Sequence, residues 1–370
     1  MNSERYHRQL ILKGFGEAAQ QKLALARVLV IGAGGLGCPA LQYLSAAGLG
    51  HIGIVDDDVV SLSNLHRQIL YTTADIGKFK VEVAAQRLRE QNPEIEVKTY
   101  LLRLERNIIL DLLKAYDYIL DGTDNFESRY LINDACSLLK KPLIFAAVSG
   151  YEGQLAVFNV ADQANNTTNY RDLFPIPPQE GEVLNCSENG VLGVLPGIIG
   201  TMQAAEVIKL ITGIGTPLVN KILNYNLLNH QFYEIRISHA DDTYTIPETE
   251  AKFLAMSKPI YGNKIINIDG EEFDALRKRE STLLIDVRES HEFPVLDPAV
   301  FLKAPMSGFP ASLNQEVVEE NIVLICQHGI RSVAAAEWLK EKYGSSKHIY
   351  SLNGGIVKWS GHFIDQEHER

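Results

Sequence analysis

The stretch VLVIGAGGLGCPALQYLSAAG, residues 28–48, decides the fold of the larger part of this chain. It begins with an apolar run typical of a buried strand and ends with a longer apolar segment typical of a helix. Between them Gly32, Gly34 and Gly37 have the spacing G-x-G-x-x-G. Such glycines permit a tight turn and let backbone N–H groups approach phosphate oxygens at a helix N-terminus. The stretch therefore predicts nucleotide binding without naming the nucleotide.

Strand-like runs alternate with amphipathic helical stretches on both sides of this loop. The runs are residues 27–32, 51–56, 96–100, 116–122 and 142–148. This alternation predicts an α/β fold with a Rossmann-like, mostly parallel sheet. Three further strand patterns, 282–289, 321–329 and 348–355, predict a second, smaller α/β domain. The charged, turn-rich stretch at 238–253 separates them, so we expect domains at 1–240 and 259–370 joined by a linker at 241–258.

Composition excludes several classes of protein. The chain has 370 residues, of which 46% are hydrophobic and 22% charged, with a formal net charge of −11. It is long enough for two globular domains and has no basic footprint for nucleic acid. The N-terminus lacks an apolar signal segment, and we expect the apolar runs to be too short to cross a membrane. We expect a cytoplasmic protein with no nucleic acid and no membrane as partner.

Polar side chains after the second predicted strand distinguish ATP from a dinucleotide. Asp56 ends that strand, where a carboxylate accepts hydrogen bonds from ribose hydroxyls. Asn64, Arg67 and Gln68 follow in SNLHRQ, and Lys80 comes soon after. A triphosphate that is about to be cleaved needs such cations, whereas a dinucleotide's pyrophosphate is satisfied by the loop backbone. Each cation taken singly is also compatible with a solvated helix face.

A second acidic pair follows the strand predicted at 116–122. Asp121 and Asp124 stand at its carboxyl end, where open α/β sheets bind ligands. Asp124 is a candidate Mg²⁺ ligand, and Asp121 is alternatively a helix cap. Four segments thus place phosphate or metal chemistry at one sheet edge, and their coincidence favours the functional interpretation.

The motif set resembles that of the MoeB/ThiF/HesA family, relatives of ubiquitin-activating enzymes. The resemblance rests on RYHRQL, GAGGLGCP, VDDDVVSLSNLHRQ, DIGKFK, DGTDNFESRYLIND and GVLGVLPGIIGTMQA, and covers residues 5–237. It implies adenylation, with ATP and Mg²⁺, of the C-terminal Gly-Gly carboxylate of a small β-grasp sulfur-carrier protein of the MoaD or ThiS type.

The resemblance also implies roles for individual residues. Gly32, Gly34, Gly35 and Gly37 match the nucleotide loop, Asp56 the ribose-binding acid, Asn64, Arg67 and Lys80 the triphosphate contacts, and Asp124 the Mg²⁺-linked acid. Arg8 matches an arginine that family dimers contribute to the neighbouring subunit's ATP site, which implies a homodimer. Cys186 matches a loop cysteine that reacts near the acyl-adenylate, although an ordinary loop cysteine remains the alternative.

One departure from the family concerns zinc. Many relatives carry C-x-x-C in a CYRCLFP-like run, whereas this chain reads NYRDLFP, with Asn169 and Asp172. The second cysteine pair is also missing near ISHADD, at 237–242. Because a structural zinc site needs about four ligands, often thiolates, we expect no zinc. Cys38 and Cys136 lie in helical patterns and are interpreted as buried hydrophobes.

Cys326 is the strongest nucleophile candidate. NIVLICQHGIRSVAAAEWL predicts a strand, a short loop and a helix, so the cysteine lies among N–H groups that favour its thiolate. Arg331 adds positive charge, His328 is either a tuning group or solvent-facing, and Asp286 and Arg288 are expected to be structural. The loop resembles the active-site loop of rhodanese domains, over roughly residues 260–370. Cysteine phosphatases place five residues between Cys and Arg, whereas this chain has four, which suits a persulfide.

These observations predict a two-domain enzyme that adenylates a sulfur carrier and supplies sulfur from a persulfide on Cys326. A persulfide sulfur donor is an implied partner. Molybdopterin synthesis is slightly favoured over thiamine thiazole or another thiolation pathway, and the acidic balance disfavours a relative acting on tRNA. A nicotinamide-dependent oxidoreductase would leave SNLHRQ and the Cys326 loop unexplained. A non-catalytic carrier-binding scaffold is the remaining alternative, because 291–308 departs from the rhodanese pattern.

Overall fold

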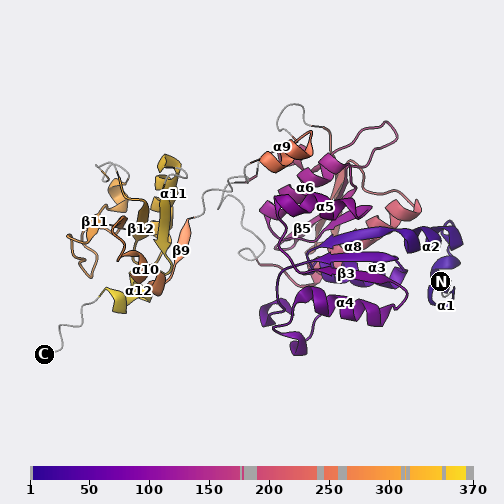
Figure 1. Cartoon of the computed structure of the whole chain (residues 1–370), viewed down its shortest axis with the longest axis horizontal. Helices are drawn as coiled ribbons and strands as arrows, with labels where there is room; N and C mark the ends of the chain where they lie inside the picture. Colours follow the sequence, from indigo (N-terminus) through magenta and orange to yellow (C-terminus); the bar gives the residue numbers. More distant parts are fainter. Residues whose placement is uncertain are drawn as a thin grey trace. The chain divides into compact units, whose positions relative to one another are not determined.

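The computed structural model divides the chain into two compact units, residues 1–259 and 260–370 (Figure 1). The structure describes residues 3–175, 177–178, 190–239, 246–256, 265–309, 313, 317–343 and 347–363. Each unit contains its own sheet and its own buried core. The two units are therefore described separately.

An eight-stranded sheet forms the centre of unit 1, in the order β3-β2-β1-β4-β5-β6-β7-β8. The strands are β1 (Arg27–Ile31), β2 (His51–Val55), β3 (Glu96–Tyr100), β4 (Tyr118–Asp121), β5 (Leu143–Ser149), β6 (Glu152–Phe158), β7 (Lys221–Asn226) and β8 (Gln231–Arg236). β1 to β5 pair in parallel, and β6 to β8 continue the sheet antiparallel. The prediction of a Rossmann-like, mostly parallel sheet is confirmed. From β1 the strand order runs to β2 and β3 on one side and to β4 and β5 on the other. This reversal of strand order at β1 places a crevice at the carboxyl ends of the strands.

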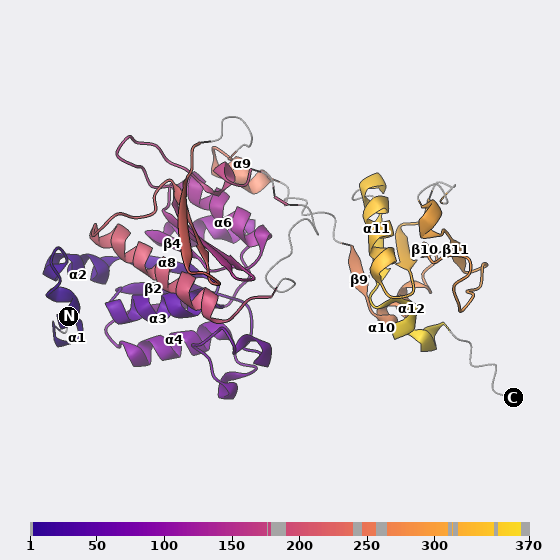
Figure 2. The same cartoon turned by 180° about the vertical axis from the view of Figure 1, so that it is seen from behind.

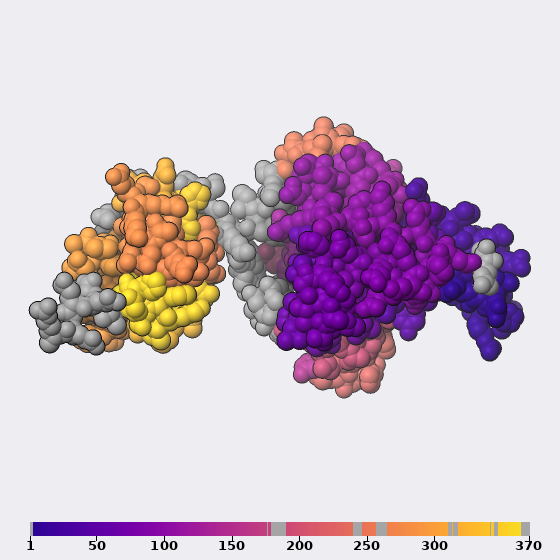
Figure 3. Space-filling view, turned by 60° about the horizontal axis from the view of Figure 1, so that its bottom comes forward, coloured from indigo at the N-terminus to yellow at the C-terminus, as the bar shows by residue number. Residues whose placement is uncertain are grey.

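Helices cover both faces of this sheet (Figures 1 and 2). α3 (Gly37–Ala47), α4 (Lys80–Gln91) and α8 (Val194–Thr212) pack together on one face, and α5 (Arg106–Lys114) packs with α6 (Phe126–Leu139) on the other. α1 (Ser3–Leu10) and α2 (Gly16–Leu25) stand out at one end of the unit, as the indigo residues in Figure 3 show. This layering explains the continuous apolar character of the central strands, which are buried on both faces.

The turn from β1 into α3 is set by two glycines. Gly32 has a φ of +94°, and a Cβ there would lie 2.7 Å from the carbonyl oxygen of Gly122. A Cβ at Gly37 would collide with the carbonyl oxygen of Gly32. Only glycine therefore allows the strand, the turn and the following loop to meet this closely. α3 ends at Gly48, which has a φ of +83° and donates its N–H to Leu44 and Ser45, as helix C-caps commonly do.

One sequence expectation about apolar runs is wrong. α8 is long and apolar enough to cross a membrane by length and composition, although the sequence had indicated that the apolar runs were too short. Half of it is buried inside unit 1, where it packs against α3 and strands β5 and β6. The core helix of a domain has the same composition as a membrane span, because each faces an apolar environment along most of its surface.

The stretch predicted as a linker contains helix α9 (Glu250–Ala255), which packs on α5. Thr249 caps it by accepting a hydrogen bond from the Lys252 N–H. Phe253 is fully buried, and the Arg106 guanidinium lies 4.8 Å from its ring centroid and donates to its carbonyl oxygen. The short helix escaped sequence analysis because a single apolar anchor produces no periodic pattern.

Unit 2 is built on a parallel sheet in the order β11-β10-β12-β13-β9. Its strands are β9 (Ile266–Ile268), β10 (Thr282–Asp286), β11 (Phe301–Lys303), β12 (Asn321–Ile325) and β13 (His348–Leu352). Its helices are α10 (Gly270–Leu276), α11 (Ile330–Tyr343) and α12 (Gly355–Lys358). The second, smaller α/β domain is confirmed. The short strands β9 and β11, each of three residues, were not recognised in the sequence.

Replacing Phe253 with alanine tests whether α9 belongs to unit 1. Because the ring is fully buried, we expect the loss of about 2 kcal/mol in the free energy of unfolding of unit 1, the transfer cost of one such side chain. Urea denaturation measures this change. Leu254→Ala is the matched control, because Leu254 is 50% exposed; equal effects of the two changes would contradict the docking of α9.

Candidate functional site

A cavity of about 760 Å³ opens at the carboxyl ends of the parallel strands of unit 1. Its walls come from the segments that follow β1, β2, β3 and β4, together with the start of α8. Eight residues singled out in the sequence line it: Gly32, Gly34, Gly35, Asp56, Arg67, Gln68, Lys80 and Asp124. The structure therefore brings together groups that are spread over about ninety residues of sequence.

Asp56 braces the glycine loop from beside the cavity. Its Oδ2 accepts a hydrogen bond from the Ala33 N–H at 2.8 Å, and its Oδ1 accepts from the Asp58 N–H at 2.9 Å. Burial raises the pKa of the Asp56 carboxyl, while the nearby Lys80 charge and these two N–H groups oppose the rise. The carboxylate thus holds the loop and still faces the cavity, where sequence analysis placed a ribose.

Two cations face the same space. Lys80 begins α4 and is only 4% exposed, and its Nζ lies 2.7 Å from Oδ2 of Asp58. Arg67 is half-buried and donates to the Ser63 carbonyl oxygen at 3.1 Å. A buried ammonium group needs a counter-charge, and the exposed Asp58 supplies it here. An anion in the cavity would offer Lys80 a second partner.

The loop after β4 contributes acids of two kinds. Asp121 is fully buried and accepts from the Thr123 N–H at 2.9 Å and the Thr123 hydroxyl at 2.6 Å. Burial raises the pKa of Asp121, against the opposing charge of Arg129. Asp124, by contrast, is exposed to the cavity. Asp121 is therefore committed to the loop, and Asp124 remains available to a ligand.

The donors that face the cavity fit magnesium. Mg²⁺ is usually held by one or two carboxylates together with substrate phosphates and water. Oxygens of Asp56, Asp57 and Asp58 lie within 4.8 Å of one another. Asp56 already accepts loop N–H groups and Asp58 already pairs with Lys80. Among the described residues of the cavity wall, Asp57 and Asp124 are therefore the exposed carboxylates outside these contacts, and either fits the ion.

Other predicted residues lie elsewhere. Asn64 is in a 3₁₀ turn and accepts the Ser61 N–H at 3.3 Å, so it shapes the Arg67 segment without lining the cavity. Gly37 lies behind the loop at the start of α3. Arg8 is exposed on α1 and is not part of its own chain's cavity wall. Cys186 lies outside the described residues.

The two segments that lack the family's cysteines are joined by a polar contact. His239 Nδ1 lies 2.8 Å from Oδ1 of Asp172, whose side chain is fully buried. The backbone and side-chain N–H groups of Asn169 donate to Oδ2 of Asp172 at 2.8 and 2.9 Å. Beside them Arg171 forms a bidentate ion pair with Asp134, at 2.7 and 2.8 Å. A carboxylate and an imidazole therefore link the two segments.

Cys326 lies at the end of β12, just before α11, as the sequence predicted. Gly329 has a φ of +85° and donates its N–H to the sulfur at 3.1 Å, and the Ser332 hydroxyl lies 3.4 Å from it. Burial raises the pKa of the thiol, but the hydrogen bonds from Ser332, His328 and Gly329 outweigh it, so the pKa lies below its ordinary value. The loop is thus built to hold a sulfur anion.

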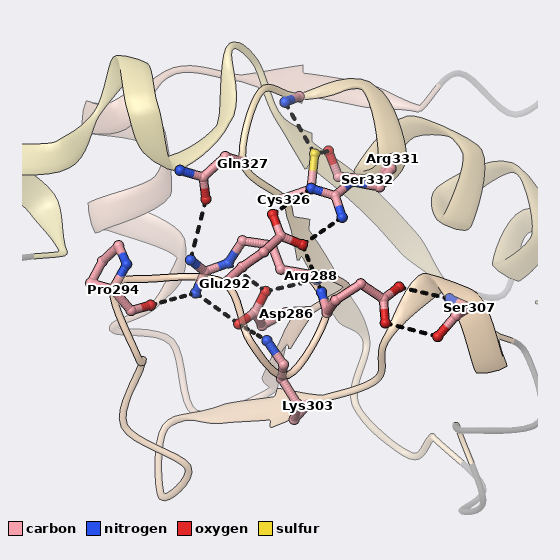
Figure 4. A network of polar contacts seen from close by, with 12 residues as sticks. Asp286, Arg288, Glu292, Pro294, Lys303, Ser307, Cys326, Gln327, Arg331 and Ser332 are labelled. Atoms are coloured by element: carbon pink, nitrogen blue, oxygen red, sulfur yellow. Dashed lines mark hydrogen bonds and ion pairs between the residues drawn. The ribbon is translucent and has the colours of Figure 1, made fainter.

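The charges around this loop are arranged in pairs (Figure 4). Arg331 forms a bidentate pair with Glu292, at 2.6 and 2.7 Å. The buried Arg288 pairs with Asp286 at 2.9 Å through both Nε and Nη2, as expected for structural residues. Hydrogen bonding to Glu292, and to a smaller extent the charge of Cys326, raise the pKa of Arg331, so the role of Arg331 as a positive charge beside the thiolate stays a prediction.

The cysteines of the α-helices of unit 1 are unreactive by environment. Cys38 and Cys136 are fully buried. Burial raises the pKa of Cys38 to about 12 and raises that of Cys136 well above its ordinary value. Their interpretation as small buried hydrophobes is therefore confirmed.

Sequence analysis missed three partners in these sites: Asp58, His239 and Glu292. Asp58 stood in the run VDDD, in which only Asp56 was assigned. His239 stood in the very segment inspected for cysteines, and Glu292 in the segment noted as unlike the rhodanese pattern. The acidic run was the available signal for Asp58; the other two pairs join positions far apart in sequence and leave no periodic pattern.

Comparison with known proteins agrees with this geometry. Residues 6–246 match the ThiF family, and residues 269–362 match the rhodanese-like domain. The chain is 37% identical over 391 residues to "Adenylyltransferase and sulfurtransferase MOCS3" of Arabidopsis thaliana, covering 96% of this chain and 83% of that protein. It is 48% identical over 235 residues to "Sulfur carrier protein adenylyltransferase" of Thermus thermophilus, covering 63% of this chain and 87% of that protein.

Among solved structures, the crystal structure of E. coli MccB with MccA-N7isoASN superposes with a TM-score of 0.58 at 22% identity, over 67% of this chain and 75% of that one. At this identity the likeness concerns the fold alone. The match over residues 6–246 covers more than half of the chain, and the relatives extend it over nearly the whole length. The resemblance inferred from the motifs is confirmed: the chain belongs to the ThiF family and carries a rhodanese-like domain after its ThiF domain.

Proposed function

We propose that this chain uses ATP to adenylate the C-terminal Gly-Gly carboxylate of a small β-grasp sulfur-carrier protein of the MoaD or ThiS type, and supplies sulfur to the activated carboxylate from a persulfide on Cys326. The observation that carries the proposal is the gathering of Asp56, Arg67, Lys80 and Asp124 around the cavity beside the glycine loop. The relatives named as adenylyltransferase and sulfurtransferase support the same pairing of activities.

The chemistry of adenylation suits these residues. An α-carboxylate has a pKa of about 3.5 and is ionised at neutral pH, so it attacks the α-phosphorus of ATP without a general base. The bond to the pyrophosphate oxygen breaks, and negative charge accumulates on the departing group. Arg67 and Lys80 neutralise that charge, and Asp56 binds the ribose. Mg²⁺, held by Asp124, supplies further neutralisation when bound.

A homodimer and a cytoplasmic location complete the proposal. Arg8 is exposed on α1, which stands out from the unit, and lies outside its own chain's cavity wall. This placement supports its donation to the ATP site of a neighbouring subunit. Molybdopterin synthesis is the preferred pathway for the carrier, with thiamine thiazole or another thiolation pathway as the alternative.

Sulfur transfer falls to unit 2. The lowered pKa of the Cys326 thiol favours the thiolate, which is the form that accepts sulfur from a persulfide donor. The linker keeps this donor at high effective concentration near the activated carrier, provided that it spans the distance between the two sites. The outer sulfur of the Cys326 persulfide displaces AMP from the acyl-adenylate and gives an acyl disulfide. A second thiolate, predicted to be that of Cys186, which lies outside the described residues, then attacks the Cys326 sulfur. This releases the carrier thiocarboxylate and leaves a Cys186–Cys326 disulfide, which an external thiol reduces.

We also propose that unit 1 needs no structural zinc. Asp172 and His239 already bond to each other, and Asn169 occupies the other carboxylate oxygen. These groups join the two segments by hydrogen bonding instead of metal ligation. A non-catalytic scaffold is a weaker alternative, since the buried Lys80 and the bound thiolate of Cys326 retain the features that catalysis needs.

Pyrophosphate exchange tests adenylation. We expect exchange between ATP and labelled pyrophosphate only when a MoaD-like or ThiS-like protein ending in Gly-Gly is present. Asp124→Asn should lower the rate by about 10²-fold, the usual effect of removing one electrostatic contact to the reacting groups. Glu82→Gln, an exposed acid on α4 outside the cavity, is the matched control. Absence of exchange with either carrier, in a folded protein with Mg²⁺, would favour the scaffold.

Replacing Cys326 with serine separates the two activities. We expect pyrophosphate exchange to stay unchanged, because Cys326 belongs to unit 2, while formation of the carrier thiocarboxylate is lost. Mass spectrometry of the carrier after incubation with ATP, a persulfide donor and a reducing thiol gives the readout. Thiocarboxylate formation at the wild-type rate would assign the sulfur to another group.

Metal removal tests the zinc proposal. We expect the purified chain to hold far less than one zinc per molecule and its melting temperature to be unchanged by a chelator. His239→Ala should lower the free energy of unfolding by about 1 kcal/mol, because it removes one hydrogen-bond partner from a buried carboxylate. Elemental analysis and calorimetry measure both effects, and stoichiometric zinc would disprove the proposal.

A further inference from the structure

Glu292 holds the one arginine of the Cys326 loop. It follows β10, and its carboxylate accepts hydrogen bonds from both Nη groups of Arg331, from Nη1 at 2.6 Å and from Nη2 at 2.7 Å (Figure 4). The Glu289 N–H donates to the same carboxylate at 2.8 Å, so its orientation is fixed. The hydrogen bonds from Arg331 lower the pKa of Glu292 to about 2, despite partial burial. Glu292 is therefore an anion whenever the site works.

The sulfur is bound by other groups. Gly329 donates its N–H to the Cys326 sulfur, and the Ser332 hydroxyl lies 3.4 Å from it. The Ser332 hydroxyl also accepts a hydrogen bond from Ser351 at 2.9 Å, which orients it. Within the described residues, the hydrogen bonds of the Arg331 guanidinium go to Glu292 rather than to the sulfur. The thiolate is thus hydrogen-bonded by neutral dipoles, while Arg331 of the same loop is paired with Glu292.

We propose that Glu292 is a positioning residue of the sulfurtransferase site. It holds Arg331 in a bidentate pair and so determines the net positive charge that acts on the Cys326 sulfur and on its incoming donor. The inference rests on the proposed role of Cys326 in sulfur transfer. It assigns to Glu292 a function in the reaction rather than in folding alone.

The surrounding contacts separate these two functions. Arg288 gives the same segment a second attachment, since its Nη1 lies 3.4 Å from Oε1 of Gln327 and its Nη2 donates to the Pro294 carbonyl oxygen at 2.9 Å. Arg288 is fully buried and paired with Asp286. A glutamine at position 292 keeps the shape of the side chain and leaves this attachment in place. Its main effect is therefore the loss of one negative charge.

Several other charged side chains belong to the segments around this loop. Arg331 and Glu292 form one pair, and Glu289 is occupied by Ser307, whose N–H and hydroxyl lie 3.0 and 2.8 Å from its carboxylate oxygens. Lys303 joins the Asp286 pair at 2.8 Å, and His328 is exposed on the loop. A conservative substitution at Glu292 changes the net charge of the Arg331–Glu292 pair and leaves the contacts of Arg288 in place.

Alkylation of Cys326 in the full-length chain tests the proposal. Its rate is followed against pH by peptide mass spectrometry with iodoacetamide, which is neutral, and iodoacetate, which is an anion. In Glu292→Gln the unpaired Arg331 should lower the apparent pKa of the thiol by about one unit and raise the iodoacetate-to-iodoacetamide rate ratio roughly threefold to tenfold. Arg331→Gln, which leaves Glu292 unpaired, should shift both quantities in the opposite direction.

The double variant Glu292→Gln with Arg331→Gln removes both charges and should return both quantities to within about twofold of the wild type. Glu289→Gln is the control for a charge change in the same segment. The proposal is overturned if Glu292→Gln changes the apparent thiol pKa and the rate ratio no more than Glu289→Gln does. It is also overturned if both quantities differ from wild type as much in the double variant as in the single variants, because a structural role predicts that result. If Glu292→Gln does not fold, Arg331→Gln and the double variant decide alone.

Alkylation requires neither ATP nor a carrier nor a sulfur donor. The test therefore remains informative if adenylation of a carrier is disproved. Conversely, a chain that exchanges pyrophosphate but shows no charge effect at Cys326 would refute the role of Glu292 alone.

Discussion

The close approach of the Gly32 carbonyl oxygen to Gly37 is the constraint on which unit 1 depends. A Cβ at position 37 would occupy the place of that oxygen, and a Cβ at position 32 would press on the carbonyl of Gly122. With both side chains absent, the end of β1, the start of α3 and the loop after β4 converge at one sheet edge. The cavity and the charged residues around it follow from this convergence, because each successive strand delivers its loop to the same place.

The second unit repeats the same physical arrangement for a different anion. β12 leads through a glycine turn into α11, and a Cβ at Gly329 would lie 2.7 Å from the Gly354 nitrogen. Backbone N–H groups at a helix N-terminus again face an anion, here a thiolate. The two sites differ in their cations. Lys80 has an exposed, exchangeable partner in Asp58, whereas Arg331 has an oriented, half-buried one in Glu292. The first arrangement suits a multiply charged phosphate chain, and the second suits a single sulfur.

Sequence reasoning succeeded where local pattern determines structure. Apolar runs located the central strands, the glycine spacing located the loop of residues 32–37, and the strand–loop–helix pattern placed Cys326 in the loop between β12 and α11. It failed for side-chain pairs between distant segments, such as Asp172 with His239 and Glu292 with Arg331. No periodicity encodes such pairs, since each depends on how two loops pack. The same limit applies to α9, whose attachment rests on one phenylalanine.

The polar link between Asp172 and His239 affects how many thiolates are available to accept persulfide sulfur. Persulfide sulfur is exchanged readily among accessible thiolates, and a zinc–thiolate cluster would offer four of them as unintended acceptors. In the part of the chain that the structure describes, Cys38 and Cys136 are buried and held as thiols, and an imidazole and a carboxylate join the segments instead. Cys326 is also buried, at 1% exposure, but its thiol is the one of these three whose pKa is lowered, so within those residues it is the cysteine held ready as a thiolate to accept sulfur.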